Sequence, residues 1–283
     1  MSRLLPELPG QIRWCGLTRI LVTSASVLAE HWPVGFQSRR QLAQAALENL
    51  EPIALQTALG SVLAQLFKTS WQHIEIYFAD QHVHLMLLPA IEQSGQASAL
   101  SSNEQQAFAR AMLINTYGEA AVQWPFRHQD AWQSGATLLA TIPALQTLTA
   151  QNLISPRKYL HLSVQPYACA LWAQTRLPAN GTVITAEPHT LRLLQLEKGK
   201  IMHIASLATD ISDLESITAW LLRERTLSGV HASACYWLNE QNNQLMLEAG
   251  RCLAQHLAGQ LKLQTLQSTR AITSLWWEAL HVA

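Results

Sequence analysis

Hydrophobic and polar positions in the C-terminal part of the chain follow first the period of strands and then that of helices. Three short apolar runs come first, and they are separated by Pro188 and by the polar turn Glu197-Lys198-Gly199-Lys200. Helical spacing, an apolar run, helical spacing and an alternating run follow. This order predicts an α/β domain in which a three-stranded meander continues into helix–strand crossovers. The expected strands are Thr182–Glu187, Thr190–Glu197, Ile201–Leu207, Ala232–Leu238 and Leu261–Leu266, and the expected helices are Ser212–Leu227 and Gln244–Ala258.

The N-terminal part of the chain carries a less regular pattern. Strands are expected at Gln11–Trp14 and Arg19–Ser24, whereas Ala25–Trp32 fits either a third strand or a short helix. From Arg40 to Lys68 the apolar residues recur with helical spacing. Pro52 falls inside this stretch, so we expect it to kink the helix or to divide it into two.

A β-hairpin is expected next. Trp71–Phe78 and His82–Leu88 are strand-like runs, and the polar turn Ala79-Asp80-Gln81 lies between them. Because side chains alternate between the two faces of a strand, the first run divides into an inner and an outer set. Ile74, Ile76 and Phe78 should face the core, with Glu75 and Tyr77 outward.

The middle of the chain is predicted to contain a capped helix and then several short elements. A capping pattern at Ser102-Asn103-Glu104-Gln105 opens the helix, and Gly118 follows its end. Ile91–Leu100, just before it, is typical of an exposed loop. The other expected elements are the strands Val122–Arg127, Ala136–Ile142 and Arg157–Val164 and the helices Pro143–Leu153 and Tyr167–Arg176.

Leu177-Pro178-Ala179-Asn180-Gly181 is the best candidate for a domain boundary, because proline and glycine cluster there. A chain of 283 residues is long enough for two lobes, each with its own core. We therefore expect an N-terminal lobe over residues 1–177 and a C-terminal lobe over residues 178–283.

The composition argues against a charged ligand surface. Lys+Arg and Asp+Glu number 19 each, and charged residues make up only 13% of the chain. A neutral surface has no general attraction for nucleic acid or anionic lipid. Together with the low charge, the ten tryptophans indicate either apolar surface for protein contacts or a tryptophan-rich core.

Cysteine usage indicates a reducing compartment. Cys15, Cys169, Cys235 and Cys252 are widely spaced in apolar contexts, so buried, reduced thiols are expected. The N-terminus has no signal-peptide pattern, and no run approaches the roughly 20 apolar residues of a membrane span. We expect a cytoplasmic protein with no direct membrane insertion.

The motifs of common catalytic sites are missing. His82 and His84 are expected on one face of a strand, but no nearby Cys, Asp or Glu completes a zinc site. Gly229-Val-His-Ala-Ser233 resembles a loosened nucleophile elbow, yet it precedes a strand where a nucleophile should follow one. No glycine-rich phosphate-binding motif is present. The sequence thus predicts no catalytic, cofactor-binding or metal site, and it does not locate a partner-binding surface.

Three segments carry a resemblance to a known family: Ile74–Pro89, Asn115–Trp124 and Leu162–Tyr167. In them, a strand pair ending in Leu-Leu-Pro precedes a helix that closes with Tyr-Gly, and a strand starts near tryptophan. This pattern resembles the actin-like pilus-assembly proteins of the PilM type and the cytoplasmic domain of GspL, their counterpart in type II secretion. The likeness spans about Trp71 to Leu207. It implies a two-lobed actin-like (ribonuclease-H-like) fold.

In nucleotide-binding members of that fold, an Asp-x-Gly turn between the first two strands of a lobe cradles phosphate. Here the expected turns are Cys15-Gly16-Leu17-Thr18 and Glu187-Pro188-His189-Thr190, which lack that pair of residues. Glu187 is either a plain turn residue, which we favour, or a contact to a metal or partner. The nucleotide site is therefore expected to be degenerate.

The resemblance implies a non-enzymatic cytoplasmic scaffold of a type IV pilus or type II secretion-like assembly platform. Its partner would be the cytoplasmic tail of a bitopic inner-membrane protein, which recruits it to the inner membrane. We expect a free-standing form without cofactor, and a homodimer is left open. The alternatives are a divergent actin-like ATPase or sugar-kinase relative using Glu187, and a regulator that binds a small ligand between the lobes.

Overall fold

The computed structural model describes residues 15–33, 40–49, 51–66, 72–89, 101–128, 137–150, 161–187, 189–227, 234–240, 244–257 and 262–268. The chain forms two compact units. One comprises Met1–Phe78, Thr147–Gln165 and Leu275–Ala283, and the other Ala79–Gln146 and Pro166–Ser274. The lobes expected at residues 1–177 and 178–283 stay a prediction, although each of the two five-stranded sheets lies wholly within one of them.

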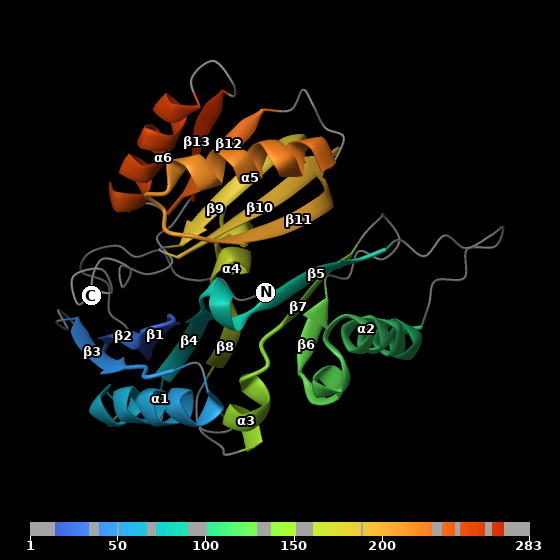
Figure 1. The fold of residues 1–283 in the computed structure, drawn as a ribbon. Helices are drawn as coiled ribbons and strands as arrows, with labels where there is room; N and C mark the ends of the chain where they lie inside the picture. Colours follow the sequence, from blue (N-terminus) through green and yellow to red (C-terminus); the bar gives the residue numbers. More distant parts are fainter. Residues whose placement is uncertain are drawn as a thin grey trace. The chain divides into compact units, whose positions relative to one another are not determined.

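The first five-stranded sheet has the strand order β3-β2-β1-β4-β8. β1 pairs antiparallel with β2 and parallel with β4, and β2 pairs antiparallel with β3. Helix α1 packs on β2 and β3 and buries the apolar side chains between Leu55 and Leu66 that face the sheet (Figure 1). The bounds are β1 Gly16–Val22, β2 Ser26–Trp32, β3 Gln41–Ala46, α1 Pro52–Leu66, β4 Gln72–Phe78 and β8 His161–Pro166.

The helix expected from Arg40 to Lys68 is wrong in its first part. Gln41–Ala46 is strand β3, and α1 begins at Pro52. Proline suits the first helical position, because its missing N–H has no partner there in any helix. Ala25–Trp32, which fitted either a strand or a short helix, contains strand β2. The strand expected at Gln11–Trp14 lies outside the described residues.

The expected β-hairpin is also wrong. β4 belongs to the first sheet, whereas β5 (His84–Leu88) pairs antiparallel with β7 (Thr137–Thr141) of a separate three-stranded sheet. A short 3₁₀ helix, η1 (Asp80–His82), separates the two strands. The run predicted at Trp71–Phe78 does form a strand, β4, but this strand pairs with β1, which is distant in sequence.

The inward set of β4 is confirmed, since Ile74, Ile76 and Phe78 are at most 1% exposed. Tyr77 was expected to point outward and is instead buried, with its hydroxyl donating to Glu75 at 2.9 Å. β4 is a central strand, flanked by β1 and β8, and central strands are commonly covered on both faces.

The three-stranded sheet has the order β5-β7-β6, and helix α2 (Ser102–Tyr117) packs against it through Ala109 and Leu113. The capping box is present one residue earlier than expected: Ser101 is the N-cap, and its backbone N–H donates to Glu104 at 2.8 Å. The strand expected at Val122–Arg127 is largely wrong. Val122 and Gln123 end the 3₁₀ helix η2 (Glu119–Gln123), and the strand β6 is Phe126–His128.

The second five-stranded sheet has the order β11-β10-β9-β12-β13 and repeats the pattern of the first. β9 pairs antiparallel with β10 and parallel with β12, and β10 pairs antiparallel with β11. The predicted order of strands and helices is confirmed. The bounds are β9 Gly181–Glu187, β10 Thr190–Glu197, β11 Lys200–Ala208, α5 Leu214–Leu227, β12 Cys235–Asn239, α6 Gln244–His256 and β13 Leu263–Gln267.

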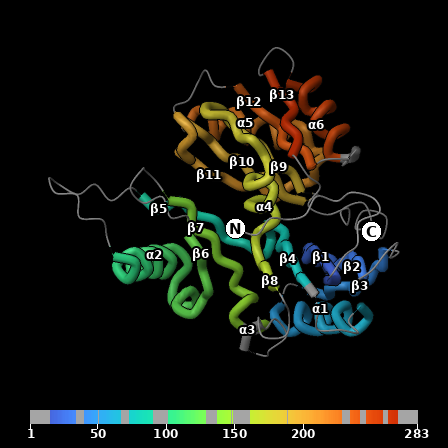
Figure 2. The backbone as a smooth tube through the Cα atoms, turned by 180° about the vertical axis from the view of Figure 1, so that it is seen from behind, coloured from blue at the N-terminus to red at the C-terminus, as the bar shows by residue number. Residues whose placement is uncertain are grey.

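Helices α5 and α6 cover one face of this sheet, and their apolar side chains meet Ile184, Leu193 and Trp237 in a common core. α6 approaches β12 closely at Gly250, where an added Cβ would lie 2.6 Å from the Trp237 ring. Helix α4 (Tyr167–Ala173) lies on the opposite face (Figure 2). There the Trp172 indole N–H donates a hydrogen bond to the Thr185 hydroxyl at 2.8 Å. Residues that alternate along β9 and β10 therefore enter two different environments.

Helix α3 (Leu145–Ala150) lies in sequence between β7 and β8. Of the four thiols expected to be buried, Cys235 is buried, Cys15 and Cys169 are partly buried, and Cys252 on α6 is exposed, so the prediction is wrong for Cys252. No helix in the described part of the chain is long and apolar enough to span a membrane.

Candidate functional site

The turn between β1 and β2 is formed by Thr23-Ser24-Ala25-Ser26, not by the expected Cys15-Gly16-Leu17-Thr18, most of which is strand. The Thr23 hydroxyl accepts hydrogen bonds from the backbone N–H groups of Ala25 and Ser26, at 3.3 and 3.0 Å. It also donates to the carbonyl oxygen of Ser26 at 3.0 Å. Backbone N–H groups in such a turn are the ones that bind anions. Here a side chain of the turn itself already occupies two of them.

The corresponding turn of the second sheet lies between β9 and β10. Glu187 ends β9, and its side chain is buried, with 3% of the residue exposed. Its Oε2 accepts a hydrogen bond of 2.9 Å from the backbone N–H of Asp80. The favoured interpretation of Glu187 as a plain turn residue is wrong, because the chain buries this carboxyl against a segment from elsewhere in the sequence.

Asp80 also contacts a cation. The Arg192 guanidinium of β10 donates through Nε to Asp80 Oδ2, and both side chains are at most 4% exposed. We call Asp80, Glu187 and Arg192 the carboxyl–arginine cluster. Among the described residues, Asp80 Oδ1 and Glu187 Oε1 are buried with no hydrogen-bond partner. The cluster thus contains two carboxyls and one cation, all of them buried.

This setting changes the protonation of the cluster. Burial, and then the neighbouring Asp80 carboxyl, raise the pKa of Glu187 well above its usual range. Burial also raises the pKa of Asp80, while the Arg192 charge and hydrogen bond oppose that rise. Arg192 therefore favours the ionised form of Asp80, whereas burial and the Asp80 charge disfavour the ionised form of Glu187.

Half-buried rings lie close to the cluster. The His84 imidazole stacks on Trp124 with centroids 5.2 Å apart, and it lies 4.6 Å from the Tyr117 ring. Burial and the charge of Arg192 lower the pKa of His84. Burial raises the pKa of the Cys169 thiol on α4 to about 12, so it is no reactive thiolate.

The predicted pairing of His82 and His84 on one strand face is wrong, because His82 lies in η1 and His84 in β5. Within the described ranges, no group of three or more His, Cys, Asp or Glu side chains is placed to hold a metal ion. The elbow-like segment Gly229–Ser233 lies outside the described residues.

Sequence reasoning singled out Glu187 but missed Asp80 and Arg192. A signal for Arg192 was present, since it is the one cation in the leucine-rich run Thr190–Glu197, and a buried cation needs a partner. Asp80 offered no such signal, because an acidic residue in a polar turn is ordinary.

No protein-family model and no curated protein sequence matches the chain. Solved structures match it over most of its length. A Bacteroides thetaiotaomicron protein of unknown function with an actin-like ATPase fold is 10% identical, with a TM-score of 0.54 over 95% of this chain and 96% of that one. A chain of the PilM–PilN type IV pilus biogenesis complex is 12% identical, with a TM-score of 0.51 over 92% of this chain and 88% of that one. The cytoplasmic domain of EpsL, an inner-membrane component of the type II secretion system of Vibrio cholerae, is 11% identical, with a TM-score of 0.45 over 95% of both chains.

The first two matches confirm that the chain has an actin-like fold, and they bear out the structural resemblance to PilM. At these identities the likeness establishes the fold, and function has to be argued from the residues.

Proposed function

We propose that this protein is a non-enzymatic cytoplasmic scaffold of a type IV pilus or type II secretion-like assembly platform. Its partner is the short cytoplasmic segment of a bitopic inner-membrane protein, and this partner recruits it to the membrane. The likeness to a chain of the PilM–PilN complex supports a role in such a platform.

The observation that carries the non-enzymatic part is the state of the two hairpin turns. In the first, the Thr23 hydroxyl occupies the N–H groups of Ala25 and Ser26. In the second, the strand ends in a buried Glu187, and burial together with the nearby Asp80 carboxyl raises its pKa and so disfavours its ionised form. A polyphosphate with its magnesium ion needs accessible backbone N–H groups and an ionised carboxylate. Neither turn offers accessible N–H groups together with an ionised carboxylate. We therefore propose that the protein binds its partner without hydrolysing nucleotide.

The chemistry of the partner contact follows from the charge of the chain. With 19 basic and 19 acidic residues in 283, few ion pairs are available for an interface. The partner segment is therefore expected to bind through apolar side chains and main-chain hydrogen bonds. Such binding weakens little between low and moderate salt.

The test is fractionation of cells that express the protein alone or with a candidate single-span partner encoded beside it. We expect a soluble protein when it is expressed alone and recruitment to the inner membrane with the partner. A partner lacking its cytoplasmic segment is the matched control and should not recruit the protein. Direct binding of the purified protein to anionic liposomes, with an affinity that collapses in salt, would instead indicate a peripheral membrane protein.

A further inference from the structure

The 3₁₀ helix η1 (Asp80–His82) lies where the chain passes from one compact unit into the other. Strand β4 ends at Phe78, the last residue of the first stretch of one unit, and Ala79 begins the other unit. A 3₁₀ helix of three residues has little stability of its own, because its hydrogen-bond geometry is poor. The position of η1 therefore depends on the contacts that it makes with the rest of its unit.

Asp80 makes two bonds that hold η1 on the second five-stranded sheet. Its backbone N–H donates to Glu187 Oε2 at 2.9 Å, which attaches η1 to the end of β9. Its side chain accepts a hydrogen bond from Arg192 Nε, which attaches η1 to β10. These attachments join the three members of the carboxyl–arginine cluster, so the hold on η1 depends on the charge state of that cluster.

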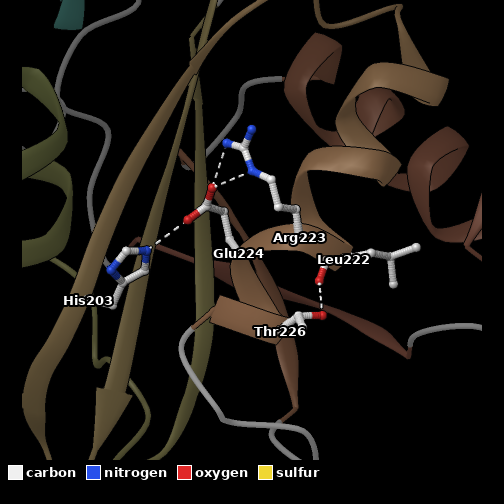
Figure 3. Close-up of polar contacts among 5 residues, drawn as sticks. All are labelled: His203, Leu222, Arg223, Glu224 and Thr226. Carbon is white, nitrogen blue, oxygen red and sulfur yellow. Dashed lines mark hydrogen bonds and ion pairs between the residues drawn. The ribbon is translucent and has the colours of Figure 1, made fainter.

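Glu224, a second buried carboxyl in this part of the chain, has a partner for each of its oxygens. It lies on α5, where its Oε2 is 2.9 Å from His203 Nε2 and its Oε1 accepts from Arg223 at 2.7 Å (Figure 3). Although burial opposes the change, these two contacts lower the pKa of Glu224, so its ionised form is favoured. In contrast, within the described ranges neither Glu187 Oε1 nor Asp80 Oδ1 has a hydrogen-bond partner.

The buried position of Glu187 disfavours its ionised form. Its carboxyl lies near that of Asp80, and the one cation of the cluster, Arg192, is already paired with Asp80. Burial and the Asp80 carboxyl therefore raise the pKa of Glu187 well above its ordinary value of about 4.5. When η1 separates from the sheet, water reaches Glu187 and its pKa returns toward that ordinary value. Separation consequently becomes more favourable as Glu187 loses its proton.

Other titratable groups lie on the elements around the cluster. They are Asp80 and His82 of η1, Arg192 of β10, His84 of β5, Tyr117 of α2, Cys169 of α4 and the exposed His189 just before β10. Burial raises the pKa of Tyr117 and of Cys169, so both stay neutral below about pH 9. Burial and the Arg192 charge lower the pKa of His84, so it is neutral above about pH 7. The remaining groups are unchanged in a Glu187→Gln variant, so comparison with that variant isolates Glu187.

We propose that Glu187 is a proton-controlled latch on η1. While Glu187 carries its proton, η1 stays on the end of β9, and when Glu187 ionises, η1 is released together with the chain connection from β4 to β5. The contribution of Glu187 to the closed form is fully present below its ordinary pKa of about 4.5. It is lost as the pH rises through the higher pKa of the closed form, so release is favoured by alkaline conditions.

Hydrogen exchange of single amides in the full chain tests the latch. The amides of Asp80, His82 and Val83 report on η1, because each donates a hydrogen bond that holds η1 or closes its turn. After correction for the intrinsic pH dependence of exchange, their protection should fall by up to about tenfold per pH unit above about pH 5, since opening releases one proton. The amides of α5 around Glu224 are the internal control, and their protection should not fall over the same range.

The matched variant is E187Q, because glutamine keeps the size of the side chain and has no proton to lose. In E187Q the fall in protection at η1 should disappear, apart from any share of Asp80 and His82, which both proteins retain. E248Q removes a carboxyl from the exposed face of α6 and should behave as the wild type does.

Three results would overturn the proposal. The first is protection at η1 that does not depend on pH in the wild type, and the second is an equal fall in E187Q. The third is a fall that the α5 amides share, because it would indicate unfolding of the whole sheet and not a local release of η1. None of these measurements involves the membrane partner, so they stand or fall separately from the proposed scaffold role.

Discussion

The backbone N–H of Asp80 donates a hydrogen bond to the side chain of Glu187, at 2.9 Å, although the two residues lie 107 positions apart. The bond ties η1 to the end of β9. It also places two buried carboxyls in one site, with Arg192 as their cation. The consequences of that arrangement can be measured.

Replacing Glu187 with glutamine should make stability less dependent on pH. The pKa of Glu187 is raised in the folded state, so this group stabilises the fold below its ordinary pKa of about 4.5. That contribution is lost as the pH rises through the higher pKa of the folded state. We expect the difference in unfolding midpoint between E187Q and wild type to shift in favour of E187Q as the pH rises above about 5.

The measurement is thermal or urea unfolding of both proteins across this pH range. E248Q is a suitable control, because Glu248 on α6 is exposed. His84, whose pKa is lowered, contributes in the opposite direction in both proteins, and taking the difference removes it. Parallel curves for E187Q and wild type would show that Glu187 is ionised in the folded protein.

Replacing Arg192 with methionine should destabilise the protein strongly. The substitution leaves Asp80 buried without a cation, a change that typically costs about 3–5 kcal/mol of unfolding free energy. The double variant D80N/R192M removes the uncompensated charge and should recover part of this loss. Denaturant unfolding of the wild type, D80N, R192M and D80N/R192M provides the four free energies of a double-mutant cycle. Strictly additive losses would mean that the two side chains do not interact.

Truncating Ile76 to alanine should cost about 2–5 kcal/mol of unfolding free energy, because a fully buried side chain leaves a cavity. Ile76 is 1% exposed in β4. Ile53 at the start of α1 is 72% exposed, and I53A should change stability by no more than about 0.5 kcal/mol. Chemical denaturation distinguishes the two. A loss at Ile76 as small as that at Ile53 would place β4 in the wrong register.

Magnesium-ATP at millimolar concentration should leave the thermal unfolding midpoint unchanged, and no hydrolysis above background should appear. The reason is that the Thr23 hydroxyl already occupies two backbone N–H groups of its turn, and that burial disfavours the ionised form of Glu187. A shift of several degrees that disappears in Glu187→Ala would refute the scaffold proposal in favour of a divergent actin-like nucleotide-binding protein.

The second sheet could be predicted almost completely from sequence, because each of its elements ends at a clear local signal. Pro188 and the turn at Lys198-Gly199 mark the meander, and the turn takes a positive φ at both residues. The first sheet was harder. Leu42 has a helical neighbour pattern, yet it lies in β3 opposite Glu30, because pairing with β2 overrides local spacing.

Strand pairing between distant segments accounts for the other errors. β4 has the pattern of a hairpin strand, but its ladder partner is β1, with Ile20 opposite Ile76. No local signal distinguishes the two arrangements. The carboxyl–arginine cluster was missed for the same reason, since Asp80 and Arg192 are 112 positions apart.

That separation matters during synthesis of the chain. The unit made of Ala79–Gln146 and Pro166–Ser274 is interrupted by Thr147–Gln165, which belongs to the other unit. Asp80 leaves the ribosome long before Arg192 is translated. The Asp80 side chain is therefore a solvated carboxylate until β10 emerges. Contacts of such high sequence separation form late and slow folding. Because the segments of the two units alternate along the chain, neither unit can be obtained by cutting the chain once. A nascent chain stalled before β10 lacks Arg192, so it cannot form the ion pair with Asp80.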